Sequence, residues 1–107
     1  MVEIKYGIQI DIVAIQENLK RIINQVYKLL PMREEGSNWE KPLETLIQEL
    51  KGMDRLLFDQ HVVFFTLLCK LEGLFELTKA EDFERYRGTI FECLGLLNTI
   101  KENVREY

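Results

Sequence analysis

Apolar residues recur at steps of three and four along most of this chain. Such steps keep side chains on one face of a helix with 3.6 residues per turn, so each run indicates a helix with one apolar stripe. The three longest runs are Ile8, Ile12, Ile15, Leu19, Ile22, Val26 and Leu29; then Trp39, Leu43, Leu46, Leu50 and Met53; and finally Phe83, Tyr86, Ile90, Cys93, Leu97, Ile100 and Val104.

These runs predict an all-α fold in which residues 1–107 form a single helical domain, a compact antiparallel bundle of three long helices plus one short helix. We expect the first helix to begin near residue 8, or with Asp11 as its N-cap. It should end at about Leu30, because the residue before Pro31 is pushed out of the helical conformation.

The connection and the second helix follow from local signals. Residues 31–38 form the predicted loop, and Ser37 or Asn38 is expected to cap a short helix with Pro42 in its first turn. Gly52 is expected at the C-terminal end of that helix, where glycine is favoured.

The third helix is predicted over roughly residues 54–77, with Asp54 as its cap. It is apolar nearly all round, which predicts burial on most of its sides. Thr78 and Glu81 match the spacing of a capping box for a fourth helix that ends at about Val104.

Residues 2–12 leave two interpretations open. Their apolar and polar residues alternate strictly, which is typical of a half-buried strand, whereas the helical spacing begins at Ile8. A lone strand is unstable, so an extended N-terminal segment would pair with the same segment of another copy. The alternative is a frayed or partly helical terminus.

Composition and charge narrow the range of partners. Hydrophobic residues make up 47% of the chain and charged residues 30%, as in a soluble globular protein. The net charge is −4 and no basic stripe is visible, so nucleic acid is an unfavoured partner. The most apolar stretch contains Asp59, Lys70 and Glu72, which argues against a membrane span or membrane partner. Glu3 and Lys5 interrupt any apolar run at the start of the sequence, so we expect no signal peptide. We expect a cytoplasmic protein.

The residue inventory gives little support for metal or cofactor chemistry. His61 is the only histidine, and Cys69 and Cys93 lack the spacing of a zinc site, so we expect neither a metal nor a cofactor. Both cysteines fall in apolar helical segments and are interpreted as buried thiols in a reducing compartment.

The fourth helix carries a second apolar face. Gly88, Phe91 and Gly95 lie together opposite its main stripe, with Leu94 beside them. Glycine inside a helix costs about 1 kcal/mol relative to alanine, and two glycines on one face allow another helix to approach closely. This face and the third helix together predict a contact with another chain, most simply in a homodimer. The alternative is that the glycines are merely tolerated.

The predicted loop offers a second candidate for recognition. It contains Arg33 and leads into Trp39 at the start of a helix, and loops and tryptophans often form binding sites. The other interpretation is that Trp39 begins the stripe of the short helix and packs inward.

One spacing suggests catalysis. Arg55 and His61, with five residues between them, match the loose Arg-x4-6-His motif, and the chain in this respect resembles the HEPN ribonucleases. The resemblance covers those two residues and departs from the family at Leu56, which replaces the usual polar residue after the arginine. It implies a dimeric helical ribonuclease in which Arg55 and His61 are catalytic.

The function that the sequence favours is a non-catalytic one. We expect a small protein–protein interaction or regulatory module that acts through an apolar helical face, as a homodimer and with another protein as partner. The alternatives are the ribonuclease and a bundle that holds a small ligand among aromatic residues such as Phe64, Phe65 and Phe91.

Overall fold

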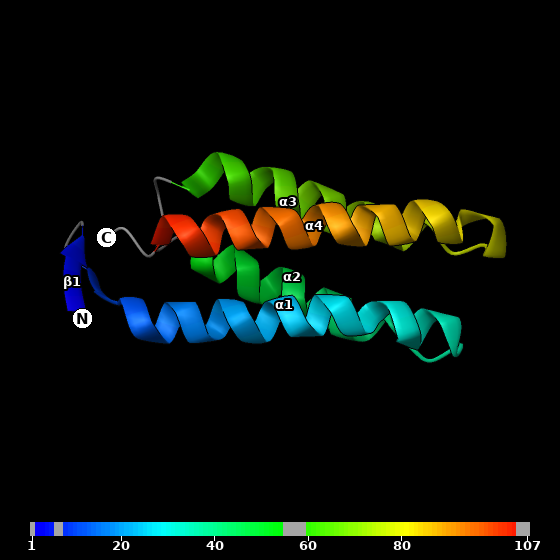
Figure 1. Cartoon of the computed structure of the whole chain (residues 1–107), viewed down its shortest axis with the longest axis horizontal. Coiled ribbons are helices and arrows are strands. Elements are labelled where there is room, and N and C mark those ends of the chain that lie inside the picture. Colours follow the sequence, from blue (N-terminus) through cyan, green and yellow to red (C-terminus); the bar gives the residue numbers. More distant parts are fainter. Residues whose placement is uncertain (1, 6–7, 55–59, 105–107) are drawn as a thin grey trace.

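Four α-helices form the body of the molecule in the computed structural model, which describes residues 2–5, 8–54 and 60–104 (Figure 1). The helices are α1 (Ile12–Glu34), α2 (Glu40–Asp54), α3 (His61–Gly73) and α4 (Phe83–Val104). Two short 3₁₀ turns, η2 (Leu74–Glu76) and η3 (Ala80–Asp82), connect α3 to α4, and a hairpin of β1 (Val2–Lys5) and β2 (Ile8–Asp11) precedes α1. The molecule measures 47 × 21 × 20 Å, so it is a bundle about twice as long as it is wide.

The predicted all-α class is confirmed, and the core follows the apolar stripes. In α1 and α4 every stripe residue from Ile12 to Leu29 and from Tyr86 to Val104 is buried. In α2 the buried residues are Leu43, Leu46, Ile47 and Leu50, while Met53 is only half-buried. Because these stripes face one another in a single cluster, each helix is held by burial of one face rather than by its intrinsic propensity.

Helix α1 does not end at Pro31. The helix passes through this proline and ends at Glu34, so the predicted end at Leu30 is wrong. The true end is a glycine cap: Gly36 has a φ of 76°, the Gly36 N–H donates to the Arg33 carbonyl (3.2 Å), and the Ser37 N–H donates to the Met32 carbonyl (2.9 Å). This is the Schellman arrangement, in which a left-handed residue after the helix satisfies its last carbonyls.

Helix α2 begins as predicted, but its end and the start of α3 differ from the prediction. Asn38 caps α2 as expected, because its Oδ1 accepts the Lys41 N–H at 3.3 Å. The helix then passes Gly52 and ends at Asp54, so α2 has 15 residues and α3, predicted to be long, has 13. Asp54 therefore ends a helix instead of capping the next one.

The turn before α4 is also capped differently. The predicted pairing of Thr78 with Glu81 is not formed; instead the Lys79 N–H donates to the Asp82 carboxylate at 3.3 Å. The cap is shifted by one residue because a 3₁₀ turn, η3, comes before α4.

At the N-terminus the extended interpretation is the one observed, with a difference in the partner. Strands β1 and β2 pair antiparallel with each other in the register Val2–Asp11, Glu3–Ile10, Ile4–Gln9 and Lys5–Ile8. The first strand thus finds its partner within the chain, and the first helix begins at Ile12, directly after Asp11. Figure 1 shows the hairpin beyond the first turn of α1, at the end of the bundle.

The glycine cap gives a first testable prediction. We expect Gly36→Ala to lower the free energy of unfolding by about 1 kcal/mol, because alanine is strained at a positive φ. Gly52→Ala is the matched control: Gly52 lies within α2, and a Cβ added there meets no atom within 4 Å, so alanine should raise stability by about 0.5–1 kcal/mol. Urea unfolding followed by circular dichroism measures both, and equal effects of the two substitutions would contradict the cap.

Candidate functional site

The most exposed large apolar side chains of the described residues lie on the outer face of α3. Val62 is 78% exposed and Phe65 is 61% exposed, and the exposed thiol of Cys69 follows on the same face. Steps of three and four residues place the three on one side of the helix. We call Val62, Phe65 and Cys69 the α3 patch.

Helix α3 has apolar residues on two sides, and within the described part of the chain only one of these sides packs against other helices, α2 and α4. Phe64, Leu67 and Leu71 are completely buried and face the core. The expectation that α3 would be buried on most sides is wrong within the chain, because a helix at a corner of a four-helix bundle buries about one stripe. The sequence already indicated which residues of α3 would be exposed. The buried stripe is Phe64, Leu67 and Leu71, at steps of three and four, and the residues of the α3 patch lie outside this stripe.

The predicted second face of α4 is open to solvent. Phe91 is 46% exposed, Gly88 and Gly95 are exposed, and Leu94 is half-buried against the core. A Cβ added at either glycine meets no atom within 4 Å. Packing within the chain therefore does not require these two glycines. We call Gly88, Phe91, Leu94 and Gly95 the α4 face.

Local interactions at the α4 face and at its border with α3 involve charged groups. The Arg87 guanidinium lies 5.3 Å from the centre of the Phe91 ring, a cation–π contact on the exposed surface. Between the helices, Lys70 Nζ donates to Glu92 Oε2 at 2.6 Å, and this hydrogen bond raises the pKa of Lys70. Asn103 Nδ2 donates to Gln60 Oε1 at 2.9 Å further along the same border.

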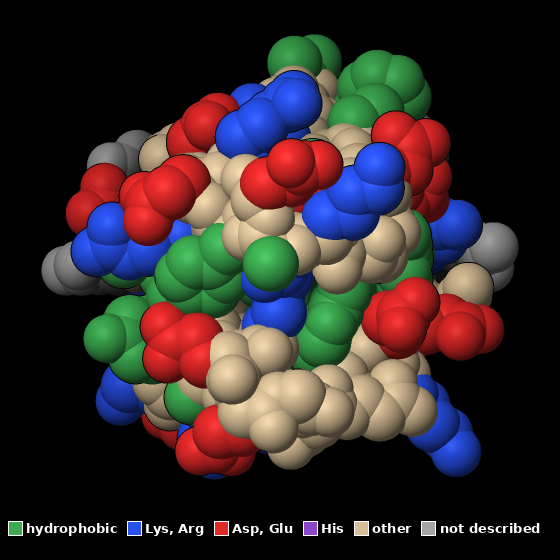
Figure 2. Space-filling model, turned by 90° about the vertical axis from the view of Figure 1, so that its right-hand side faces the viewer, with side chains coloured by type: hydrophobic (Ala, Val, Ile, Leu, Met, Phe, Trp, Pro, Cys, Tyr) green, Lys and Arg blue, Asp and Glu red, His purple; other side chains and the backbone are tan. Residues whose placement is uncertain are grey.

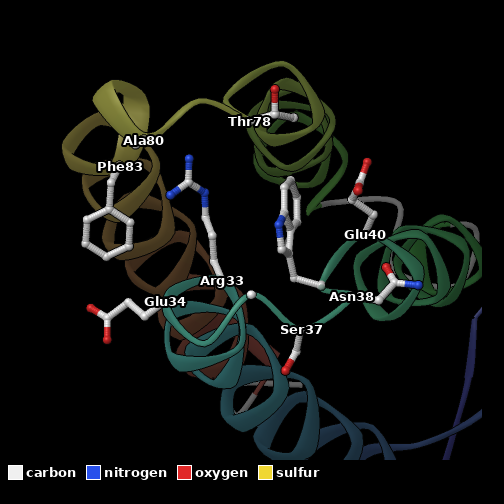
Figure 3. A pocket seen from close by; sticks show the side chains of 10 residues that line it. Arg33, Glu34, Ser37, Asn38, Glu40, Thr78, Ala80 and Phe83 are labelled. Atoms are coloured by element: carbon white, nitrogen blue, oxygen red, sulfur yellow. The ribbon is translucent and has the colours of Figure 1, made fainter.

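The other predicted recognition residue, Arg33, is used inside the chain. Its Nη2 donates to the carbonyls of Leu77 (2.8 Å) and Lys79 (2.7 Å), and its guanidinium lies 5.3 Å from the Phe83 ring centre and 4.8 Å from that of Tyr86. Figure 3 shows Arg33 extending from the end of α1 toward the turn that carries Thr78 and Ala80. Arg33 thus ties the end of α1 to the connection between α3 and α4.

Trp39 packs inward, as the second interpretation of the loop proposed. It is 8% exposed, and its ring centre lies 5.0 Å from that of Tyr86, edge to face, and 6.3 Å from that of Phe75. Tyr86 is completely buried, and burial raises the pKa of its hydroxyl. Trp39 is therefore chiefly a core residue at this end of the bundle.

A hollow of about 680 Å³ remains at the same end. It is lined by Arg33, Glu34, Gly36, Ser37, Asn38, Trp39, Glu40, Thr78, Ala80 and Phe83. Figure 2 looks onto this end and shows hydrophobic side chains near its centre, with acidic and basic ones around them. The hollow lies at the surface, and Phe64, Phe65 and Phe91 do not line it, so it is not the aromatic core site considered from the sequence.

The possible ribonuclease motif lies only in part within the described residues. Arg55 lies outside the described residues. His61 is exposed, and its Nδ1 lies 3.0 Å from both carboxylate oxygens of Asp54. His61 therefore links the start of α3 to the end of α2.

The two cysteines differ in environment, and one expectation is wrong. Cys93 is buried as predicted, whereas Cys69 is exposed in the α3 patch. Burial raises the pKa of the Cys93 thiol from 9.0 to about 12. Among the described residues, no group of three or more His, Cys, Asp or Glu side chains is placed to hold a metal ion.

Comparisons of the chain with protein-family models, with curated proteins and with solved structures found no match. No helix within the described part of the chain is long and apolar enough to cross a membrane. The α3 patch and the α4 face, which carry the exposed side chains of Val62, Phe65 and Phe91, form the candidate site.

The thiol environments give a second prediction. In the folded protein at pH 8, a thiol reagent should label Cys69 quickly and Cys93 only upon unfolding, because Cys93 is buried and its thiolate is disfavoured. Mass spectrometry of labelled protein measures this, and Cys69→Ser should abolish the fast labelling. Fast labelling of Cys93 in that variant would contradict the packing of α4.

The same shift predicts a loss of stability in alkali. The pKa of the Cys93 thiol is about 12 in the folded protein and 9.0 in its ordinary state. The contribution of the buried neutral thiol to the free energy of unfolding is therefore fully present below pH 9 and is lost as the pH rises toward 12. Tyr86, whose pKa is also raised, acts in the same direction. Cys93→Ala should lower stability at pH 7 but should reduce the decline above pH 9, measured by urea unfolding at several pH values.

Proposed function

We propose that this chain is a small, non-catalytic protein–protein interaction module that acts as a homodimer through the outer faces of α3 and α4. The single observation that carries the proposal is the α3 patch, in which Val62 and Phe65 are 78% and 61% exposed on one helix face. Contiguous exposed apolar side chains in a soluble protein mark contacts with other molecules more often than isolated ones do.

The free energy available from covering the α3 patch supports this choice. Burying a valine or phenylalanine side chain contributes about 1.5–3 kcal/mol relative to leaving it in water. The patch lies on a rigid helix anchored by Phe64, Leu67 and Leu71, so little conformational entropy is lost when a partner covers it. A second helix laid along α3 would bury Val62, Phe65 and Cys69 together.

The α4 face supports a close helical contact. Gly88 and Gly95 are seven residues apart, so they lie at the same angular position, and neither is needed for packing inside the chain. Two helical glycines on a solvated face cost about 1 kcal/mol each relative to alanine. A partner helix that approaches their backbone and covers Phe91 would offset this cost.

Substitution in the α3 patch tests the proposal. Phe65→Glu should shift the homodimer toward monomer and raise its dissociation constant at least about tenfold, because it places a charge in the contact. Helical content should stay unchanged, since Phe65 is mostly exposed in the single chain. Light scattering at several concentrations and circular dichroism measure the two effects.

Two controls and one further test variant accompany Phe65→Glu. Gln48→Glu adds the same charge to an exposed site on α2 and should leave the mass unchanged, whereas Phe64→Glu should unfold the chain because Phe64 is completely buried. Phe91→Glu tests the α4 face and should also favour the monomer. A wild-type chain that is monomeric at all concentrations would refute the homodimer.

The glycines give a separate prediction. Gly95→Ala should raise the stability of the monomer by about 0.5–1 kcal/mol, because alanine is the better helix former and its Cβ meets nothing. If a partner helix uses the glycine, the same change should weaken dimerisation. A variant that becomes more stable and dimerises as before would show that Gly95 is merely tolerated.

A further inference from the structure

The hollow between the end of α1 and the start of α2 contains a cation without an anionic partner. Arg33 lines this hollow of about 680 Å³ and is half-buried. Among the described residues its side chain forms no ion pair with a carboxylate, and its Nη2 donates to two neutral carbonyls instead. Charges that are taken out of water are normally paired, so this guanidinium favours an anion in the hollow.

The guanidinium is held in place by the chain itself. Two hydrogen bonds of 2.8 and 2.7 Å fix Nη2, and Cζ lies 5.3 Å from the Phe83 ring centre and 4.8 Å from that of Tyr86. The Nε atom is buried and has no hydrogen-bond partner within the described part of the chain. Since Nη2 is used and Nε is buried, Nη1 is the nitrogen that a ligand in the hollow can bind. Little conformational entropy is lost when an anion binds a side chain that is already fixed.

A second unpaired donor lies against Arg33. Tyr86 is completely buried beside the guanidinium, and its hydroxyl also has no hydrogen-bond partner among the residues that the structure describes. Trp39, which lines the hollow, packs edge to face on the same ring with 5.0 Å between the ring centres. Arg33 Nε and the Tyr86 hydroxyl can both donate, and buried donors without a partner in the chain favour a bound acceptor nearby.

The start of α2 lines the hollow across from Arg33. Figure 3 shows Asn38 and Glu40 on this side. The N–H groups in the first turn of a helix have no acceptor within the helix, and the helix dipole favours negative charge beside them. Asn38 Oδ1 accepts the Lys41 N–H, which leaves those of Trp39 and Glu40 for other acceptors. Backbone donors and the guanidinium thus border the same hollow.

Two carboxylates line the hollow as well and limit the charge of the ligand. Glu34 and Glu40 are exposed, and Figure 3 shows both side chains extending away from the Arg33 guanidinium. Because water and salt screen exposed charges, the half-buried Arg33 has the stronger effect at short range. Further from it the two carboxylates repel negative charge, which favours an anion with one charge over a phosphate dianion.

We propose that this hollow binds a small organic carboxylate with one negative charge and a flat apolar body. The carboxylate accepts from Arg33 Nη1 and faces the start of α2, and the apolar body packs against Trp39 and Phe83, the two aromatic residues of the lining. A volume of about 680 Å³ is in the range of small-molecule sites. The site is separate from the α3 patch and the α4 face, so it does not rest on the proposed homodimer.

Titration with phenylacetate tests the proposal. Trp39 is the only tryptophan of the chain, so tryptophan fluorescence reports on the hollow. Phenylacetate added to the full chain at constant ionic strength should give a saturable change in this fluorescence. Phenylacetamide has nearly the same shape but no charge, and it should bind at least about tenfold more weakly, because a hydrogen bond from arginine to a charged oxygen is stronger. Inorganic phosphate, which lacks the apolar body, should also bind more weakly than phenylacetate.

A pair of variants locates the bound carboxylate. Arg33→Gln removes the charge and should weaken phenylacetate binding at least about tenfold, with little effect on phenylacetamide. Lys41→Gln is the matched control: Lys41 is exposed on α2 and is not part of the lining, so its loss should leave the binding of both compounds unchanged. Circular dichroism shows whether Arg33→Gln still folds. If it does not, the comparison of phenylacetate with phenylacetamide on the wild-type chain decides the proposal.

Three results would overturn the carboxylate site. The first is the lack of saturable phenylacetate binding in both fluorescence and isothermal titration calorimetry. The second is phenylacetamide or phosphate binding as tightly as phenylacetate, and the third is an equal effect of Arg33→Gln and Lys41→Gln. The homodimer is tested separately, since Phe65→Glu should leave phenylacetate binding unchanged: Phe65 is not among the lining residues.

Discussion

The number of apolar stripes that four helices can bury against one another determines which apolar side chains of this molecule form the core and which remain exposed. A helix at the corner of a four-helix bundle contacts its neighbours over a limited arc, and the core contains one stripe from each. Helices α1 and α4 each have one dominant stripe and it is fully buried. Helix α3 has apolar residues on more than one side, so Val62 and Phe65 remain in solvent. The candidate site is thus a direct consequence of how much apolar surface the bundle can enclose.

A structural feature could be predicted from the sequence when many residues determine it together, and was often missed when one or two hydrogen bonds determine it. The stripes of α1 and α4 were predictable because burial repeats over many turns and no single residue decides it. Helix ends depend on one or two hydrogen bonds. At Pro31 the local rule was overridden, since the helix continued until Gly36 could adopt a positive φ. The cap at Asp82 was missed because a 3₁₀ turn shifted the register by one residue.

The candidate site was predicted in part for the same reason. Periodicity placed Gly88, Phe91 and Gly95 away from the core of α4, and they are exposed. The same spacing placed Trp39 in the stripe of the short helix, and it packs inward on Phe75 and Tyr86. Periodicity could not show that Arg33 serves the chain itself, because its partners, the carbonyls of Leu77 and Lys79, lie far away in sequence. Cys69 was misplaced for a related reason. Its apolar neighbours suggested burial, although only the outward side of α3 was available to it.

The contact of Arg33 with the turn between α3 and α4 also has a kinetic consequence. It joins residues separated by 44 and 46 positions, so it can form only after the helices on both sides have docked. A contact of this kind is absent from early, locally structured states and contributes little to the rate of folding. It acts instead on the barrier to opening, since this end of the bundle cannot separate without first releasing the guanidinium. We therefore expect this arginine contact to slow unfolding of the bundle more than it speeds folding.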